Sequence, residues 1–281
     1  MVYLISDLHG DFKVFTKKAL KRCKYNITAE DYVIVLGDFG LCWSLDKEFI
    51  YNCKWLSNLP FTILFISGNH DNLDLLESYP IEEWHGGNVH HVVRDKIIHL
   101  MNGQVFNIDG ISIFTMGGAQ SHDVQGGILD RNASDFRIKK KQARKNNLPY
   151  RIIGESYWEN EIPSLCEFAE GARNLARVGF EVDVILTHCT PRAVQEKLIQ
   201  QGELKRDLEV NALTEYFDYL EENVSYSHWF SGHIHLDAVM NAKHTVVYHD
   251  FVPLPLFIEK VKQLTLAAMM LELEEKYGNE D

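Results

Sequence analysis

Hydrophobic and polar positions follow two alternating spacings in the N-terminal third of the chain. Short apolar runs occupy residues 2–6, 32–36 and 61–66, and each has the length of a buried strand. Between them, apolar residues recur at helical spacing over residues 11–25 and 46–58. A strand–helix–strand–helix–strand order favours right-handed crossovers, so we predict three parallel strands in one sheet.

The pattern changes in the middle of the chain. Two strand-like runs within residues 104–116 flank Asp109-Gly110, a dipeptide typical of hairpin turns, so we expect a mixed or second sheet here. Residues from about 119 to 163 then form an irregular excursion, and its segment 137–145 holds six basic residues. We interpret the excursion as an inserted, lid-like segment of helix and loop. We interpret its basic run as a solvated helix face.

The C-terminal third returns to regular elements. Ser164 and Glu167 form a capping box for a helix predicted to run through Arg177. The other predicted elements are a strand at 182–186, a helix within 208–224, a strand at 227–230, two strands within 244–261 and a helix over 264–277. No repeat or linker interrupts the chain, so we predict a single α/β domain over residues 1–281.

Composition and charge narrow the classes of protein. A hydrophobic content of 46% is typical of a globular core, and the net charge of −12 disfavours a general nucleic-acid or anionic-membrane surface while leaving room for a local basic patch. The five cysteines contain no CxxC pair, which favours free thiols. No signal peptide and no apolar run of about 20 residues is present. We therefore expect a cytoplasmic protein that has no membrane partner. The sequence does not determine its oligomeric state.

Five apolar runs each end in a group that can bind a metal ion. Their tips read Asp7-Leu8-His9, Gly37-Asp38, Gly68-Asn69-His70-Asp71, Thr187-His188 and Gly232-His233-Ile234-His235. Ligands of open α/β sheets bind at the carboxyl ends of the strands, so we expect these tips to meet on one rim. Residues i and i+2 of an extended chain point the same way, so Asp7 with His9, and His233 with His235, should converge. The glycines before three of these groups allow close backbone approach.

The set of candidate ligands indicates two metal ions. It comprises Asp7, His9, Asp38, Asn69, His188, His233 and His235. Seven groups are too many for one tetrahedral zinc with an open position, but they suit two transition metals bridged by a carboxylate. Imidazole and oxygen donors without thiolates favour Mn, Fe, Zn or Ni over Ca or Mg, and Mn is our first choice. Asn69 can bind only through its amide oxygen.

In order and type, the five tips resemble the calcineurin-like metallophosphoesterases, whose pattern is D-x-H, G-D, G-N-H-[DE], H and G-H-x-H. The matches here are DLH, GD, GNHD, the histidine of LTHCTP, and GHIH, within residues 7–235. The resemblance implies a four-layer α/β/β/α sandwich, with two mixed sheets packed face to face and flanked by helices. It assigns one metal to Asp7, His9, Asp38 and His235. It assigns the other to Asp38, Asn69, His188 and His233, with Asp38 bridging.

The resemblance also implies roles next to the substrate. His70 would contact the phosphoryl group or protonate the leaving oxygen, while a metal-bound hydroxide attacks phosphorus in line. Neighbouring residues of an extended segment point in opposite directions, so we expect Asn69 to chelate while His70 does not. Arg151 and Asn69 are the candidate substrate-binding residues. For Asp71 two alternatives stay open: it orients His70, or it caps the following helix.

The chain departs from the protein serine/threonine phosphatases of this superfamily. Those enzymes read GDxVDRG, whereas GDFGLCWS here places Leu41 and Cys42 where the second aspartate and the arginine would stand. A phosphatase of that animal type is therefore disfavoured. The stretch from MGGAQSHD to YRIIGESYW is similar to a bacterial and phage subset. This similarity implies extra residues between Asp123 and Tyr150, and it makes Arg151 the candidate phosphate clamp.

We therefore expect a dinuclear metal-dependent phosphoesterase that prefers phosphomonoesters. Phosphodiester hydrolysis of nucleotides is the close alternative. A nuclease acting on long nucleic acid is a further alternative, which salt-dependent binding through residues 137–145 would support and which the acidity of the chain disfavours. A metal-bound scaffold without turnover is the other class, and the intact ligand set with His70 argues against it. Histidines without partner spacing, such as His99 and His122, are interpreted as surface or satisfied core residues, and Trp158 as packing.

Overall fold

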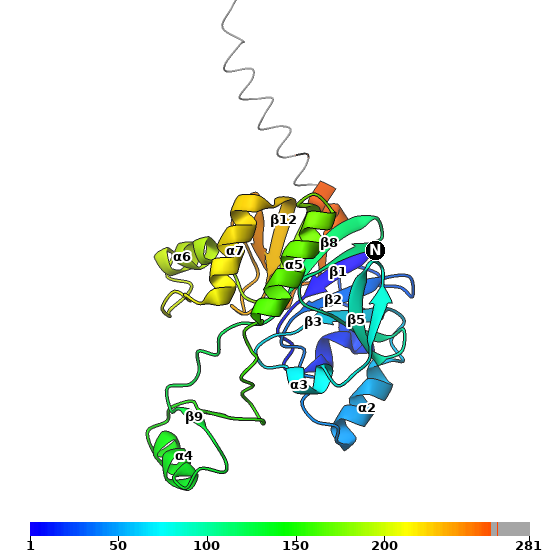
Figure 1. Cartoon of the computed structure of the whole chain (residues 1–281). Helices are drawn as coiled ribbons and strands as arrows, with labels where there is room; N and C mark the ends of the chain where they lie inside the picture. Colours follow the sequence, from blue (N-terminus) through cyan, green and yellow to red (C-terminus); the bar gives the residue numbers. More distant parts are fainter. Residues whose placement is uncertain (260–262, 264–281) are drawn as a thin grey trace, which may run out of the picture.

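Two β-sheets pack face to face and are flanked by helices on their outer faces (Figure 1). The computed structural model describes residues 1–259 and 263, so the helix predicted over 264–277 lies outside the described residues. The layers confirm the α/β/β/α sandwich. Among the described residues, no helix is long and apolar enough to cross a membrane.

Within the described residues, the first sheet has seven strands in the order β15-β1-β2-β3-β6-β5-β4. Their bounds are β1 (Val2–Ile5), β2 (Tyr32–Leu36), β3 (Thr62–Ile66), β4 (Ile81–Trp84), β5 (Gly87–Val93), β6 (Ile97–Leu100) and β15 (Val252–Pro253). The predicted parallel arrangement of β1, β2 and β3 is confirmed. β6 continues it, whereas β4, β5 and β15 are antiparallel to their neighbours.

In the part of the chain that the structure describes, the second sheet has six strands in the order β13-β14-β12-β11-β8-β7. Their bounds are β7 (Gln104–Ile108), β8 (Ile111–Met116), β11 (Glu181–Thr187), β12 (Ser225–Ser231), β13 (Ala238–Val239) and β14 (His244–Val246). The hairpin predicted around Asp109-Gly110 joins β7 to β8, and Asp109 adopts the left-handed φ of 53° that such turns require. The second sheet thus begins at this hairpin.

The helices are short or medium in length. Their bounds are η1 (Phe12–Phe15, a 3₁₀ turn), α1 (Lys17–Leu20), α2 (Lys47–Leu56), α3 (Leu73–Leu76), α4 (Phe136–Lys145), α5 (Leu165–Arg177), α6 (Arg192–Gln200) and α7 (Ala212–Asn223). The capping box of Ser164 and Glu167 is present at the start of α5. The prediction of one helix over 11–25 was wrong, because Thr16 is extended, with ψ of 149°, and starts α1 by capping Ala19.

The C-terminal part also differs from its prediction. Two strands were expected within residues 244–261, but β15 has only two residues and residues 254–259 are helical. Pro253 and Pro255 explain the difference. A proline lacks the N–H that would continue a sheet ladder, yet its fixed φ suits the first turn of a helix.

The central strands are apolar on both faces because each face meets a different layer. In β1, Leu4 belongs to the cluster between the two sheets, while Ile5 belongs to the cluster under α2. In the second sheet, Ile113 faces the first sheet and Phe114 packs under α5 and α7. Continuous apolar runs are the pattern expected of strands covered on both sides.

His99 in β6 is a buried histidine without a hydrogen-bond partner among the described residues. The residue is 5% exposed, and its ring lies 5.1 Å from the ring of Phe65 and 5.5 Å from that of His90, centroid to centroid. The expectation of a satisfied core histidine was therefore wrong on this point. Burial lowers the pKa of His99 to about 3, so the ring is neutral in the folded protein.

Replacing His99 by phenylalanine is expected to make folding less sensitive to acid. The unfolded chain protonates this ring near pH 6.5 and the folded chain only near pH 3, so stability is lost as pH falls through this window. Each pH unit within it costs the wild type about 1.4 kcal/mol that the variant does not lose. Urea unfolding of the chelator-treated proteins at several pH values measures this, with His85→Phe as exposed control. Equal pH dependence of the wild type and His99→Phe would contradict the expectation.

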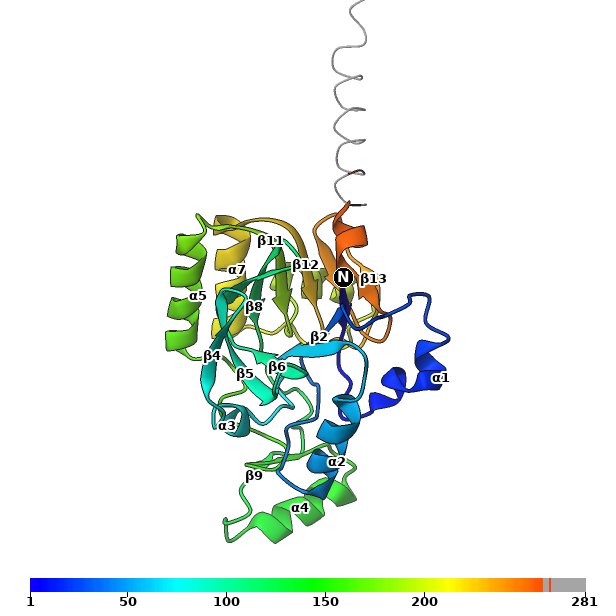
Figure 2. The ribbon, with the colours of Figure 1, turned by 90° about the vertical axis from the view of Figure 1, so that its right-hand side faces the viewer.

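A small unit extends away from both sheets on the side where β1, β2 and β3 end (Figures 1 and 2). It contains α4 and the two-stranded parallel sheet of β9 (Ile128–Leu129) and β10 (Arg151–Ile152). We refer to residues 128–152 as the projecting unit. Within it, the basic run forms a helix, as expected, and its side chains are mostly exposed.

Candidate metal centre

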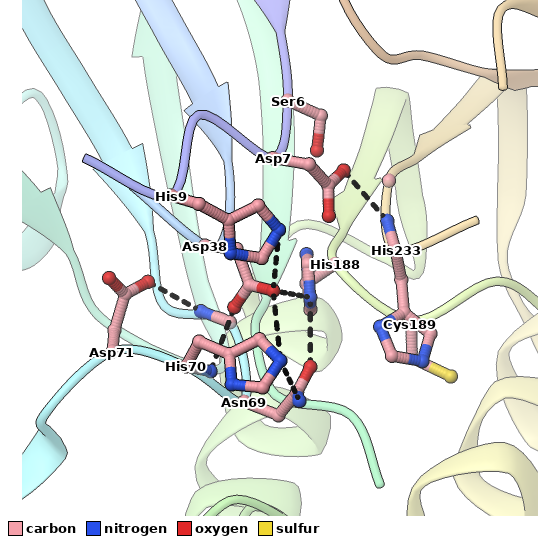
Figure 3. A network of polar contacts seen from close by, with 12 residues as sticks. Ser6, Asp7, His9, Asp38, Asn69, His70, Asp71, His188, Cys189 and His233 are labelled. Atoms are coloured by element: carbon pink, nitrogen blue, oxygen red, sulfur yellow. Dashed lines mark hydrogen bonds and ion pairs between the residues drawn. The ribbon is translucent and has the colours of Figure 1, made fainter. Parts of the chain in front are cut away.

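The structure brings the seven predicted ligands together where strands of both sheets end. β1, β2 and β3 lead into Asp7, Asp38 and Asn69, and β11 leads into His188 (Figure 3). β12 leads into the segment that carries His233 and His235. Both sheets therefore contribute to one centre, at the carboxyl ends of their strands.

Asp7, His9 and His235 form the first group of ligand atoms, which lie within 4.8 Å of one another. Nε2 of His9 and Nε2 of His235 are 3.0 Å apart, and Nε2 of His235 is 3.3 Å from Oδ1 of Asp7. This Oδ1 is buried and has no hydrogen-bond partner among the described residues. Buried carboxylate oxygens are normally paired, so an unpaired one that faces two imidazoles fits a cation site.

Asp38 lies between this group and a second one. Its Oδ2 is 3.7 Å from Nε2 of His9 and 3.5 Å from Nε2 of His188. Nδ1 of His188 is 2.7 Å from the carbonyl oxygen of Leu36, which leaves Nε2 for a metal. Burial alone would lower the pKa of His188, but the carboxylates of Asp38 and Asp7 raise it to about 9. The negative charge of these carboxylates, which stabilises a protonated imidazole here, would also stabilise a bound divalent cation.

The amide of Asn69 is oriented by residues for which the sequence had suggested no role. Its Nδ2 donates to Oγ of Ser121 at 3.1 Å, and this hydroxyl donates to Glu161 at 2.6 Å. Oδ1 of Asn69 then lies 3.2 Å from Nε2 of His188. The amide oxygen, the only metal-binding atom of asparagine, therefore faces the centre.

His233 reaches the centre through a contact that the sequence did not reveal. Its Nε2 lies 3.1 Å from Oε1 of buried Glu209, and its ring centroid is 5.0 Å from that of His188. Because Nε2 faces a carboxylate, Nδ1 is the nitrogen left for a metal. Glu209 lies in a loop without a recognisable motif, so only the tertiary structure identifies it. Arg206 pairs with the same Oε1 at 2.8 Å.

Replacing Glu209 by glutamine is expected to weaken metal binding about 10- to 100-fold, because it removes the charge that orients His233. Calorimetric titration of the apo-protein with Mn²⁺ measures the affinity. Glu203→Gln in the same loop is the control, because Glu203 is exposed and, within the described residues, its side chain has no hydrogen bond or ion pair to a predicted ligand. Unchanged affinity in Glu209→Gln would show that His233 needs no such support.

Five of the predicted ligands have left-handed backbones. The φ angles are 55° at Asp7, 47° at His9, 49° at Asp38, 69° at His233 and 56° at His235. The expectation that extended i, i+2 pairs converge was therefore wrong, although Asp7 and His9 do converge. His233 and His235 face different groups. Left-handed backbone at non-glycine residues costs about 1–2 kcal/mol each, and such strain concentrates at functional sites.

Glycines permit the close approach of these tips. A Cβ on Gly68 would lie 2.1 Å from Oδ1 of Asp38, and one on Gly37, whose φ is +86°, would lie 2.3 Å from Nδ1 of His188. Any side chain at either position would displace a ligand. The predicted role of the glycines before Asp38 and Asn69 is thus supported by the contacts.

His70 faces the same centre as Asn69. Its Nε2 lies 3.2 Å from Nδ2 of Asn69, 3.0 Å from a terminal nitrogen of Arg151 and 4.0 Å from Oδ2 of Asp38. The expectation that the two neighbours point in opposite directions was wrong, because the chain leaves the extended conformation after β3. Burial, and then the charge of Arg151, lower the pKa of His70 to about 4. Its atoms also fall within 4.8 Å of those of His9 and Asp38.

Asp71 holds the backbone behind the centre. Its carboxylate accepts hydrogen bonds from the N–H groups of Gly68 at 2.9 Å, Gly40 at 2.9 Å and Phe39 at 3.3 Å. Helix α3 is capped by Asn72 instead, so the capping alternative was wrong. The contacts of Asp71 join the tips of β2 and β3. A catalytic role for Asp71 stays a prediction.

A cavity of about 400 Å³ opens beside the ligands. Arg151 lines it and is held by Asp123, whose Oδ1 accepts from Nε at 2.8 Å. Trp43, with 41% of its surface exposed, also lines it. The lining is completed by Asp123 itself and by His9, Asp38, His70, His122, Leu204, Lys205, Arg206, His233, Ile234 and His235. The cavity therefore combines four of the seven predicted ligands with three cationic side chains.

Several other predicted residues are also located. His122 was interpreted as a surface or satisfied core residue without a role in the site. It lines the cavity and contacts Arg206. Trp158 is 3% exposed, so its interpretation as packing is confirmed. Leu41 and Cys42 are buried in the core under α2, so neither offers a polar group to the cavity. Nδ1 of His70 has no hydrogen-bond partner among the described residues.

A family model described as "Calcineurin-like phosphoesterase" matches residues 1–237 of the chain. A lariat debranching enzyme from Schizosaccharomyces pombe is 24% identical over 203 residues, which cover 68% of this chain and 35% of that enzyme. The chain thus spans about a third of the length of this curated relative. A solved structure, the phosphopantetheinyl hydrolase from Mycobacterium tuberculosis, aligns over 88% of this chain and 87% of its own, with 13% identity and a TM-score of 0.37.

Proposed function

Because the chain belongs to the calcineurin-like phosphoesterase family, and is thus a metal-dependent phosphoric ester hydrolase, we propose that phosphomonoesters are its preferred substrates. The observation that carries this proposal is the cationic lining of the cavity beside Asp38, which comes from Arg151, Lys205 and Arg206. Oδ2 of Asp38 lies between two groups of ligand atoms, and His70 and Arg151 line the same cavity. Three cationic side chains in the cavity complement a dianionic phosphoryl group.

The donor set fits two divalent transition-metal ions. One would be held by Asp7, His9, Asp38 and His235, and the other by Asp38, Asn69, His188 and His233. The buried, unpaired Oδ1 of Asp7 and the absence of thiolates among these residues agree with such ions, with Mn²⁺ our first choice over Fe, Zn or Ni. When bound, the ions supply Lewis acidity and a water molecule of lowered pKa.

The chain's own residues position the substrate. Arg151 can donate two hydrogen bonds to phosphoryl oxygens, and Asp123 holds its guanidinium in place. Arginine is only a donor, so in its contact with Nε2 of His70 the imidazole accepts. A phosphoryl group would compete for Arg151 and release Nε2. His70 could then hold a proton at the leaving oxygen, as a general acid does.

A phosphodiester of a nucleotide is the second candidate. The indole of Trp43 is exposed at the edge of the cavity, and an aromatic face there can stack on a base. A phosphodiester carries one negative charge on the reacting group, which makes poorer use of the cationic lining.

Hydrolysis of p-nitrophenyl phosphate and bis-p-nitrophenyl phosphate by the apo-protein reloaded with Mn²⁺ tests the proposal. Faster turnover of the monoester supports it, and faster turnover of the diester supports the second candidate. Two bound ions without turnover of either ester would favour a scaffold over an enzyme.

A further inference from the structure

The projecting unit differs sharply in charge from the rest of the chain. Residues 128–152 contain eight arginines and lysines and two aspartates, a net charge of +6. The remaining residues contain twenty basic and thirty-eight acidic residues, a net charge of −18. The overall acidity, which disfavours the binding of nucleic acid, is thus a property of the remaining residues and not of the projecting unit. Such a separation of charge is the usual footprint of a surface that binds a polyanion.

Most of the positive charge on α4 is not neutralised by the protein. Among the described residues, only Lys139 of this helix has a carboxylate partner, Asp135 at 2.9 Å. Arg137, Lys141 and Lys145 are exposed and have no ion pair there. Unpaired basic side chains on one short helix repel one another, so a bound polyanion would relieve that repulsion.

The positive charge continues from α4 into the cavity. Nε of Arg144 donates to the hydroxyl of Tyr150 at 3.1 Å, and Nζ of Lys140 lies 5.9 Å from the centre of the same ring. The next residue, Arg151, contacts Nε2 of His70 at 3.0 Å. A chain of phosphates that leaves the centre past Arg151 therefore meets Tyr150 and then α4.

Aromatic rings alternate with these cations, which favours a single strand over a membrane. Tyr150 and Phe136 lie beside Lys140, and Trp43, which is exposed, lines the cavity. Single-stranded nucleic acids bind to such alternation of basic and stacking side chains. A membrane-binding helix needs a broad apolar face, but Ile138 is the one large exposed apolar side chain of α4.

We propose that the projecting unit binds a single-stranded nucleic acid and presents its terminal phosphate to the cavity. This inference rests on the proposed phosphomonoesterase function and names its substrate class. The unit supplies sequence-independent affinity through phosphates and stacked bases. The metal centre acts only on the end that passes Arg151.

The test compares two triple variants of the full-length protein. Arg137, Lys141 and Lys145 on α4 are replaced by glutamine in the first, and Lys17, Lys18 and Lys21 at α1 in the second. All six are exposed, and both variants lose three positive charges. Fluorescence anisotropy with oligothymidylate of about 20 nucleotides, phosphorylated at both ends, measures binding in the presence of chelator. Phosphate release from the same strand and turnover of p-nitrophenyl phosphate are then measured with Mn²⁺.

We expect the α4 variant to bind the strand at least about tenfold more weakly near 0.1 M salt, with a salt slope shallower by about two. Its KM for the strand should rise by a similar factor, while its turnover of p-nitrophenyl phosphate and all properties of the α1 variant stay unchanged. Equal losses in both variants would overturn the inference, because they would reflect net charge alone. Binding to phosphatidylserine vesicles without strand binding would also overturn it.

The two proposals can fail separately. A wild type that hydrolyses p-nitrophenyl phosphate but neither binds nor dephosphorylates the strand overturns this inference and leaves the proposed function standing. A wild type that hydrolyses neither compound with bound metal overturns the proposed function.

Discussion

Replacement of Asp38 by asparagine is expected to abolish turnover and to remove at least one metal ion. Oδ2 of Asp38 lies between His9 and His188, and Oδ1 accepts the N–H of His70 at 2.8 Å. Asparagine can keep the second contact but provides no bridging carboxylate. We expect metal affinity to fall more than about 100-fold. Removal of a residue that only orients a ligand lowers affinity about 10- to 100-fold, and removal of the ligand itself should lower it further. Metal content by atomic spectroscopy and turnover of p-nitrophenyl phosphate measure the two effects.

Asp95→Asn is the matched control for this prediction. Asp95 is exposed and has a φ of 57°, so this variant makes the same chemical change at another left-handed residue. It should retain both ions and full turnover. If Asp38→Asn also retained two ions and most of its activity, Asp38 would not bridge the metals.

Replacement of His70 by alanine is expected to lower kcat by about 10² to 10⁴ while the metal content stays at two ions. A positioned general acid typically contributes this factor. His70 lies on the cavity side of Asp38, in contact with Arg151. Turnover of p-nitrophenyl phosphate and metal content, measured on the same preparation, decide the result.

The structure offers a specific alternative to this role. Atoms of His70, His9 and Asp38 lie close enough together to share one ion. If the His70→Ala variant lost an ion, the result would show that His70 is a metal ligand. If its kcat were unchanged, the result would show that His70 takes no part in the reaction. His85→Ala, at an exposed histidine outside the cavity, controls for loss of an imidazole.

Much of the fold is readable in the sequence because burial leaves a local pattern. The strands β1, β2 and β3 are continuous apolar runs since both of their faces are covered, and the hairpin after β7 follows from Asp109-Gly110. The helix predicted over 11–25 failed at Thr16, where an extended residue with a capping hydroxyl divides a periodic stretch. Periodicity describes which face is buried, but not where a backbone turns.

The identity of the candidate ligands was also a property of the sequence, because each follows directly after a buried strand. Their geometry was decided by the tertiary structure. The left-handed φ angles of Asp7 and His9 replace the extended pairs expected from spacing, and they persist because glycines let neighbouring tips pack against them. No side-chain pattern encodes such strain, since packing from other strands imposes it.

The sequence by itself determined the three parallel strands, the hairpin that begins the second sheet and the residue types at the centre, since these depend on short-range patterns of burial. The four-layer arrangement was implied by the resemblance to a family. The tertiary structure alone decided which distant residues support the residues at the centre. Glu209 meets His233, Asp123 holds Arg151, and Arg151 joins the basic helix α4 to the cavity. These contacts join residues far apart in the chain, or separated by irregular loops, and only the packing of the whole fold brings them together.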